Sequence, residues 1–203
     1  MTALPFLSLN LRRNPFGELT PAERTELGIV DCSEAIQHLS QERAAVQIVG
    51  EKGFGKTTHL LLLATHLIGN VYIHIPECQR AMIPPMGEPL LIDEAQRLTV
   101  MQRWQTFRSD RRLVLGTHTN FEVQLRRAGR RVLTIAADRF TNASHVHKVL
   151  NARIEFVRRV AGPIPSITIK TAAALCRQFG SDIRSMEHAM YHKFQQLRDP
   201  RDV

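Results

Sequence analysis

The chain has 203 residues, of which 43% are hydrophobic and 23% are charged, and its formal net charge is +8. This size and composition are ordinary for a soluble globular protein with one α/β core and a small addition. No apolar run approaches the ~20 residues of a membrane span, and apolar residues precede the Arg12-Arg13 pair, the reverse of a secretory signal. We therefore expect no membrane association and a cytoplasmic location. Three scattered cysteines without CxxC spacing argue against a disulfide framework or a zinc site.

The chain begins with a segment that the sequence predicts to be irregular over residues 1–19. Thr20-Pro21-Ala22-Glu23 then has the pattern of a capping box with proline at the first helical position. A second short helix is expected after Asp31 or Ser33, ending near Leu39. We expect residues 1–40 to pack on the α/β core that follows.

Apolar strand patterns then alternate with helical patterns between residues 41 and 140. The expected strands are 45–49, 71–75, 89–92, 113–115 and 132–136, and the expected helices are 56–67, 100–107 and 121–127. Repeated strand–helix units predict an α/β fold with a parallel five-stranded sheet flanked by helices on both faces. About a dozen residues, 76–88, join the second and third strands. This length is near the minimum for a parallel crossover, so we expect a reduced connection there.

Residues 141–203 have a purely helical pattern. Helices are expected over 144–160, 167–179 and 182–197, with Gly162, Pro163 and Pro165 breaking the chain after the first. This tail is too short for a large domain and predicts a small C-terminal helical lid.

A glycine-rich loop between the first strand and the next helix is the strongest functional signal. Its residues, with the threonine that follows, are Gly50, Glu51, Lys52, Gly53, Phe54, Gly55, Lys56, Thr57 and Thr58. In such a loop, backbone N–H groups and the helix N-terminus bind phosphate oxygens. We expect Lys56 to reach the β- and γ-phosphates of ATP and the Thr57 hydroxyl to ligate Mg²⁺.

Two adjacent acids end the third strand. We expect Asp93 to help hold Mg²⁺ and Glu94 to orient or deprotonate the attacking water. The alternative is a pair of exposed acids at a strand end, which is less expected about 35 residues after a P-loop lysine.

Three further sites follow downstream. Thr117, with Asn120 as second choice, ends the fourth strand at the same sheet edge as the loop and can contact the γ-phosphate or the water. Arg130, in the basic run of residues 126–131, is the first candidate for an arginine acting on a neighbouring subunit's nucleotide. Arg184, on the first turn of the last helix, can point back toward the nucleotide. The alternatives are a polar turn and two surface arginines.

Together these motifs resemble the AAA+ ATPase family over about residues 16–197. Gly50–Thr57 is similar to its Walker A motif and Leu90–Glu94 to its Walker B motif, while Thr117, Arg130 and Arg184 fall near sensor 1, the arginine finger and sensor 2. The run Leu-Ile-Asp-Glu-Ala-Gln-Arg-Leu is most similar to bacterial members of the transposition-regulator and secretion type. The resemblance implies ATP and Mg²⁺ as cofactors, a nucleotide at a subunit junction and a homo-oligomer.

The charge is divided unevenly along the chain. Residues 1–100 carry 8 Lys/Arg against 11 Asp/Glu, a balance of −3, whereas residues 101–203 carry 19 against 8, a balance of +11. A basic half indicates an anionic partner, with duplex DNA first, although a generally basic surface has the same composition. No winged-helix domain follows the lid, so DNA would contact the ATPase itself or a partner protein.

Three functions remain open from the sequence. The leading hypothesis is an ATP-hydrolysing assembly switch that acts on DNA, in transposition or a related transaction, with a transposase-like or other DNA-acting protein as partner. A second is a nucleotide-dependent adaptor that binds a protein and turns over slowly. A third is a P-loop kinase, which the Asp93-Glu94 pair disfavours because adjacent acids suit water activation.

Overall fold

The computed structural model describes residues 6–200 and 202–203, and they form two compact units. The α/β unit is Val30–Arg139, and the helical unit contains the described residues of Met1–Ile29 and Phe140–Val203. Among the described residues, no helix is both long and apolar enough to cross a membrane.

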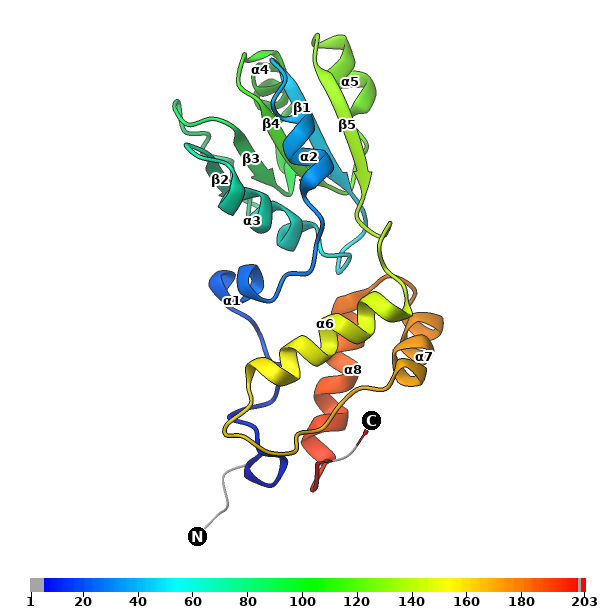
Figure 1. Ribbon diagram of the computed structural model, residues 1–203. Helices are drawn as coiled ribbons and strands as arrows, with labels where there is room; N and C mark the ends of the chain where they lie inside the picture. The colour runs from blue at the N-terminus through cyan, green and yellow to red at the C-terminus, as the bar shows by residue number, and fades with distance from the viewer. Residues whose placement is uncertain (1–5, 201) are drawn as a thin grey trace. The chain divides into compact units, whose positions relative to one another are not determined.

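The α/β unit is built on a five-stranded sheet in which every paired neighbour is parallel, as the sequence predicts (Figure 1). The strand order is β2-β3-β4-β1-β5. The strands are β1 (Ala44–Val49), β2 (Val71–His74), β3 (Leu90–Asp93), β4 (Leu113–Thr117) and β5 (Arg131–Ala136). In this order β4 lies between β1 and β3, so the strand tips that carry the glycine-rich loop and the acid pair are not direct neighbours.

Helices cover both faces of this sheet because its strands are apolar on both sides. One apolar cluster joins β1 residues such as Val46 and Ile48 to α2 (Ser33–His38) and α3 (Lys56–His66). The other joins Ala45 to elements on the opposite face. Those elements are η2 (Ala95–Arg97), α4 (Val100–Arg108) and α5 (Glu122–Arg127). Successive side chains of β1 are buried on opposite faces of the sheet, which is the period of two that a strand imposes.

The connection between β2 and β3 contains no helix, which confirms the reduced crossover. Arg111 stabilises it through the backbone: its guanidinium donates to the carbonyl oxygens of Gly87, Pro84 and Met86 at 2.8, 2.8 and 3.1 Å. A loop without regular hydrogen bonds leaves carbonyl groups without partners, and one arginine satisfies three of them.

The helical unit contains the three predicted C-terminal helices, each somewhat shorter than expected. They are α6 (Ala143–Phe156), α7 (Ile169–Phe179) and α8 (Ile183–Gln196), preceded in the chain by η1 (Leu7–Leu9) and α1 (Pro21–Glu26). Asn142, Thr168 and Asp182 cap α6, α7 and α8 by accepting a backbone N–H. The capping box of Thr20 and Glu23 opens α1 as predicted.

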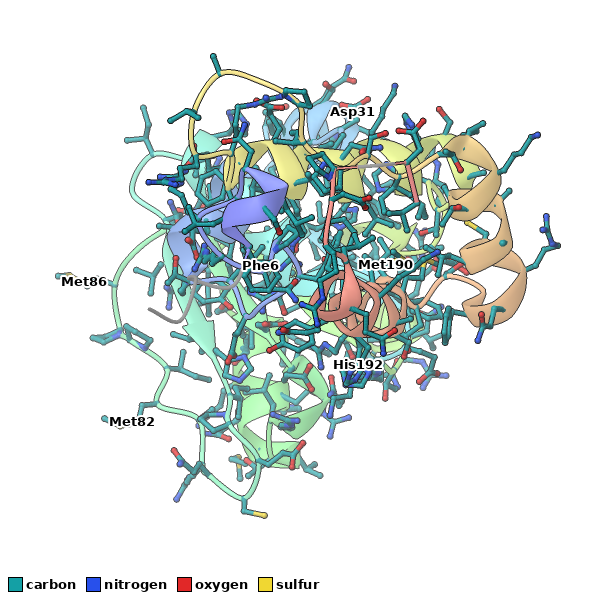
Figure 2. The ribbon with its side chains drawn as sticks, turned by 90° about the horizontal axis from the view of Figure 1, so that it is seen from below. Phe6, Asp31, Met82, Met86, Met190 and His192 are labelled. Atoms are coloured by element: carbon teal, nitrogen blue, oxygen red, sulfur yellow. The ribbon has the colours of Figure 1, made fainter. Side chains whose placement is uncertain are left out.

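The described residues up to Ile29 belong to the helical unit, whereas residues 30–40 belong to the α/β unit; the expected division was into residues 1–40, 41–140 and 141–203. The Phe16 ring contacts the Phe194 ring edge-on with centroids 5.0 Å apart. Buried Arg153 donates to the carbonyl oxygens of Pro15 and Gly17. Phe6 also packs against the apolar cluster that contains Phe16 and Phe194. It lies, like Met190, on the helical unit in Figure 2. Residues 1–5 of the expected irregular segment lie outside the described residues. The apolar residues of the segment therefore complete the core of three helices that could not bury their own faces.

Candidate functional site

The glycine-rich loop joins β1 to α3 and depends on glycine for its shape. Gly53 and Gly55 have φ angles of 92° and 84°, in the left-handed region that favours glycine. A Cβ added at Gly50 would lie 2.8 Å from the Cβ of Ala137, which is too close for any side chain. The Gly50 N–H donates to the carbonyl of Thr117 at 3.2 Å and so ties the loop to the tip of β4.

Lys56 begins α3, and its side chain is folded back into the loop. The side chain is buried, and its ammonium donates to the carbonyl oxygens of Gly50 and Glu51, both at 2.9 Å. Its charge is thereby held within the loop that would receive phosphate oxygens.

Asp93 is fully buried at the end of β3 and is held by several donors. Its Oδ2 accepts from the Thr57 hydroxyl at 2.8 Å and the Tyr72 hydroxyl at 3.2 Å, and it lies 3.2 Å from His74 Nδ1. Space for the carboxylate comes from Gly116 on β4, where an added Cβ would lie 2.9 Å from Asp93 Oδ1. The acid pair and the loop are therefore joined through α3, because β4 separates their strands.

The Thr57 hydroxyl and the Asp93 carboxylate are a donor set that suits Mg²⁺. This ion prefers oxygen ligands and usually takes one or two from a protein, with waters and substrate phosphates for the rest. Among residues 6–200 and 202–203 there is no group of three or more His, Cys, Asp or Glu residues that could hold a metal by themselves. The two oxygens thus fit an ion shared with a phosphate ligand.

Glu94 follows with an unusual backbone. Its φ is 62°, a left-handed conformation that costs energy for a residue with a side chain. Its Oε2 accepts from Gln96 Nε2 at 2.7 Å and pairs with Arg97 at 3.2 Å, and the side chain is 16% exposed. Arg97 also pairs with Glu77 at 2.9 Å. The carboxylate is thus close to the loop edge and is already engaged by two side chains of its own turn.

His118 is a site residue that the sequence reasoning missed. Its Nε2 lies 3.4 Å from Lys56 Nζ and 3.7 Å from Glu94 Oε2, and its Nδ1 lies 3.7 Å from Glu51 Oε2. His118 therefore stands between the lysine and the acid that the sequence selected. The available signal was its place directly after the fourth strand, where side chains alternate between opposite faces.

Thr117 and Asn120, which the sequence selected on this turn, have other partners. The Thr117 hydroxyl is fully buried, donates to the carbonyl of Thr119 and accepts its N–H, both at 3.0 Å. Asn120 Oδ1 accepts from Gln47 Nε2 at 2.7 Å and from the Glu122 N–H at 2.8 Å. Both side chains are therefore hydrogen-bonded within the turn that presents His118, and the contact of Thr117 or Asn120 with a phosphate remains a prediction.

Arg130 does not fit the role of an arginine acting on a neighbouring subunit. It is 4% exposed, and its guanidinium donates to the carbonyl oxygens of four residues. These are Phe107, Arg111, Thr106 and Ser109, at 2.7, 2.7, 3.1 and 2.6 Å. Burial lowers the pKa of Arg130 to about 10, so the group is still charged at neutral pH. It stabilises the end of α4 and the loop that follows, and the expected role is corrected for this residue.

The remaining candidates have the following positions. Glu51 and Lys52 expose their side chains on the glycine-rich loop, whereas Phe54 packs against the apolar cluster beside α3. Thr58 is half-buried one residue after Thr57. Arg184 is exposed on the first turn of α8, in the helical unit, and its approach to a nucleotide remains a prediction.

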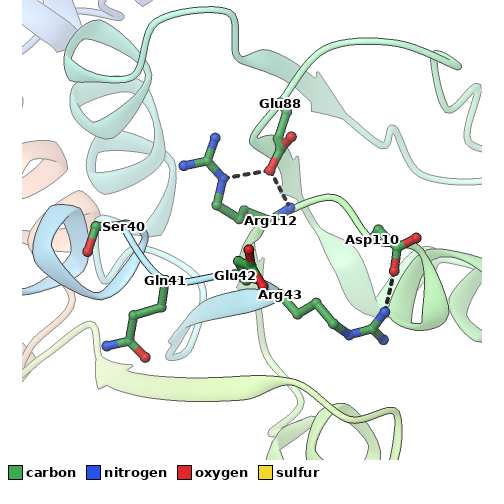
Figure 3. A pocket seen from close by; sticks show the side chains of 7 residues that line it. All are labelled: Ser40, Gln41, Glu42, Arg43, Glu88, Asp110 and Arg112. Carbon is green, nitrogen blue, oxygen red and sulfur yellow. Dashed lines mark hydrogen bonds and ion pairs between the residues drawn. The ribbon is translucent and has the colours of Figure 1, made fainter.

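A cavity of about 350 Å³ lies at the opposite end of the sheet (Figure 3). Its walls come from the segments that precede β1, β3 and β4: Ser40, Gln41, Glu42, Arg43, Glu88, Asp110 and Arg112. Arg112 pairs with Glu88 at 2.6 Å and Arg43 pairs with Asp110, so each of these cations faces its own acid. Ligands of open parallel sheets bind beyond the carboxyl ends of the strands, which is the edge where the glycine-rich loop lies.

In comparison with known proteins, no protein-family model matches the chain, and no curated protein matches it.

Proposed function

We propose that this protein is an ATP-binding and ATP-hydrolysing P-loop protein of the AAA+ type. The observation that carries the proposal is the 2.8 Å contact of the Thr57 hydroxyl with the Asp93 carboxylate, at the N-terminus of the helix that follows the glycine-rich loop. A phosphate held by the loop and a Mg²⁺ ion held by these two oxygens would have to be neighbours, and this contact beside the loop supports that arrangement.

Each residue of the site then has a role. Backbone N–H groups of the loop after Gly50 and the Lys56 ammonium bind the phosphates, and Thr57 and Asp93 would hold Mg²⁺. The ion, when bound, neutralises charge on the phosphate oxygens. Glu94 orients a water and accepts its proton. His118, between Lys56 and Glu94, is placed to hydrogen-bond the terminal phosphate or this water.

The contacts of Glu94 support slow turnover in the isolated protein. Its carboxylate is engaged by Gln96 and Arg97, so it must leave or share these contacts before it can take a proton from water. Such a protein would remain in its ATP-bound state until a partner changed this turn. This observation keeps the adaptor hypothesis as the second candidate, with a protein partner in place of DNA. The kinase hypothesis ranks below both, because the adjacent acids Asp93 and Glu94 suit activation of water.

The assembly switch also needs an arginine from a neighbouring subunit and a surface for DNA. Arg127, at the end of α5, replaces Arg130 as first candidate because it is exposed and, within the described part of the chain, makes no ion pair or side-chain hydrogen bond. Several arginines of the basic half are not available to DNA. Arg111, Arg130 and Arg153 bind backbone carbonyls of this chain, so the +11 balance overstates the charge that is available for phosphates.

The deciding experiment is phosphate release from ATP without any acceptor, with and without duplex DNA. Acceptor-independent release that depends on Lys56 supports hydrolysis and excludes a kinase. Tight ATP binding without release would favour the adaptor. Failure to bind ATP in calorimetry would overturn the proposal as a whole.

A further inference from the structure

Two histidines one helical turn apart lie on the exposed side of α8. His188 and His192 are both exposed, and their Nε2 atoms are 3.3 Å apart. Residues four apart on a helix lie on the same face, so the helix geometry itself places the two rings next to each other. In Figure 2 the His192 ring lies at the surface of the helical unit. The pair belongs to a different unit from the candidate ATP site and plays no part in it.

We propose that His188 and His192 form a binding site for a divalent transition metal of the Zn²⁺ class. Imidazole nitrogen is a preferred ligand of these ions, and two histidines at this spacing on one helix face can bind one ion together. Two nitrogens 3.3 Å apart, each about 2.0–2.1 Å from a zinc ion, would subtend about 104–111° at the metal. This range includes the tetrahedral angle. The two nitrogens are therefore already close to the separation that the ion requires, and a turn of each ring adjusts it.

The present ring orientation is an edge-to-face pair with an interplanar angle of 84° and centroids 4.6 Å apart. In this pair, one ring nitrogen must donate its proton to the other if the two are hydrogen-bonded. A metal would replace the shared proton once both rings turn their lone pairs toward it. This rotation is cheap because the terminal torsion of histidine has broad minima and both rings are exposed.

Two protein ligands give an open site. Waters would fill the remaining positions, and a ligand from another molecule could replace them. Arg184, one turn before His188, is also exposed and adds a positive charge that weakens the attraction for a cation. We therefore expect modest affinity, in the order Cu²⁺ above Ni²⁺ and Zn²⁺, as nitrogen sites generally show.

The test is titration of the untagged protein with Zn²⁺ and Ni²⁺ in a buffer that does not chelate, followed by calorimetry. One ion per chain is expected. His188→Ala and His192→Ala should each weaken binding by about tenfold or more, because the second nitrogen then no longer adds to the first at high effective concentration. His66→Ala, which removes another exposed histidine, in the α/β unit, should leave binding unchanged.

Thermal unfolding supplies a second readout that does not depend on calorimetry. An ion that bridges one turn of α8 stabilises the folded state, so saturating Zn²⁺ should raise the Tm of the wild type and of His66→Ala but not of the two variants at the pair. Equal affinities in all four proteins, a stoichiometry well above one that the variants do not change, or no binding at all would overturn the proposal. ATP binding is measured separately, so loss of one function is distinguishable from loss of the other.

Discussion

The Thr57 hydroxyl lies 2.8 Å from the Asp93 carboxylate, although the two residues are 36 positions apart in the sequence. The contact joins the first turn of α3 to the end of β3 across the strand that separates β3 from β1. Gly116 on that intervening strand allows it, because a side chain there would collide with the carboxylate. The predictions below follow from this arrangement and from the residues around it.

Replacing Lys56 by alanine should abolish tight ATP binding. Within the described part of the chain, Lys56 is the buried lysine of the glycine-rich loop. Hydrogen bonds to charged groups are worth about 1.5–3 kcal/mol each. A loss of about 10- to 100-fold or more is expected in calorimetry. Lys52→Ala is the matched control, since it removes an exposed lysine from the same loop and keeps the backbone N–H. Equal affinities in the two variants would remove the phosphate-binding role of the loop lysine.

Glu94→Gln should bind ATP and hydrolyse it far more slowly. The amide keeps the shape of the side chain but cannot accept a proton, and general-base assistance is typically worth ~10²–10⁴-fold. Arg97→Ala should have the opposite effect, because it frees the carboxylate from its ion pair. Single-turnover phosphate release measures both. A Glu94→Gln variant with near-normal turnover would place the catalytic role elsewhere.

Substitutions of His118 and Thr117 should affect different properties, the rate of hydrolysis and the stability of the fold. His118→Ala is expected to slow hydrolysis by about tenfold or more with little change in stability, because its ring stands beside Lys56 and Glu94. Thr117→Val should instead lower the free energy of unfolding by about 1–3 kcal/mol, because its buried hydroxyl holds the turn. Urea unfolding and phosphate release on both variants check this. The reverse pattern would restore Thr117 as the residue that contacts the phosphate.

Arg130→Ala should destabilise the α/β unit strongly. The variant removes a buried guanidinium and leaves the carbonyls of four residues without this partner, which we expect to cost roughly 2–4 kcal/mol. Arg127→Ala, three residues away and exposed, should change stability by less than about 0.5 kcal/mol. Chemical denaturation measures both values. If Arg127→Ala also loses ATPase activity that a Lys56→Ala partner restores in a mixed assembly, Arg127 acts between subunits.

Duplex DNA should bind weakly and with a strong dependence on salt. Exposed arginines such as Arg108 and Arg127 can neutralise phosphates and release condensed counterions, and assembly with an ATP analogue would multiply such contacts. Fluorescence anisotropy over a salt series, with analogue or ADP, measures this. The double alanine variant of these two residues should show weaker binding and a smaller salt slope. Absence of binding at low salt in both nucleotide states would favour a protein partner.

Local patterns were sufficient to predict the elements and the parallel sheet. The short apolar run of β1, which ends at a glycine, and the capping box of Thr20 and Glu23 are local patterns in the chain, so they can be recognised without a structure. The glycine-rich loop is predictable for the same reason. The left-handed backbone angles of Gly53 and Gly55 are local requirements, whereas the close approach of Ala137 to Gly50 comes from a distant part of the chain.

The directions of the side chains at the end of β4 could not be predicted from local sequence patterns. Thr117, His118 and Asn120 are all polar, and the choice between them depends on Gln47, a buried residue of β1 that binds Asn120 and the Phe121 N–H. Such a contact joins residues more than 70 positions apart. The sequence therefore identified the turn, but it did not indicate that His118 is the residue of this turn whose ring lies near Lys56 and Glu94.

The positions of Arg130 and of the N-terminal segment also depend on contacts with distant parts of the chain, which the sequence does not reveal. An arginine in a basic run has the same sequence pattern whether it is exposed or buried, and only the fold brought the carbonyls of Phe107 and Ser109 to its guanidinium. Likewise, Phe16 is apolar in any context, but the sheet already has helices on both faces, whereas the three C-terminal helices leave an apolar surface that this ring covers. Sequence determined which groups could bind a phosphate, because that chemistry lies in one short loop. Tertiary structure decided which of the distant polar groups face that loop, because burial and hydrogen bonding are settled between segments far apart in the chain.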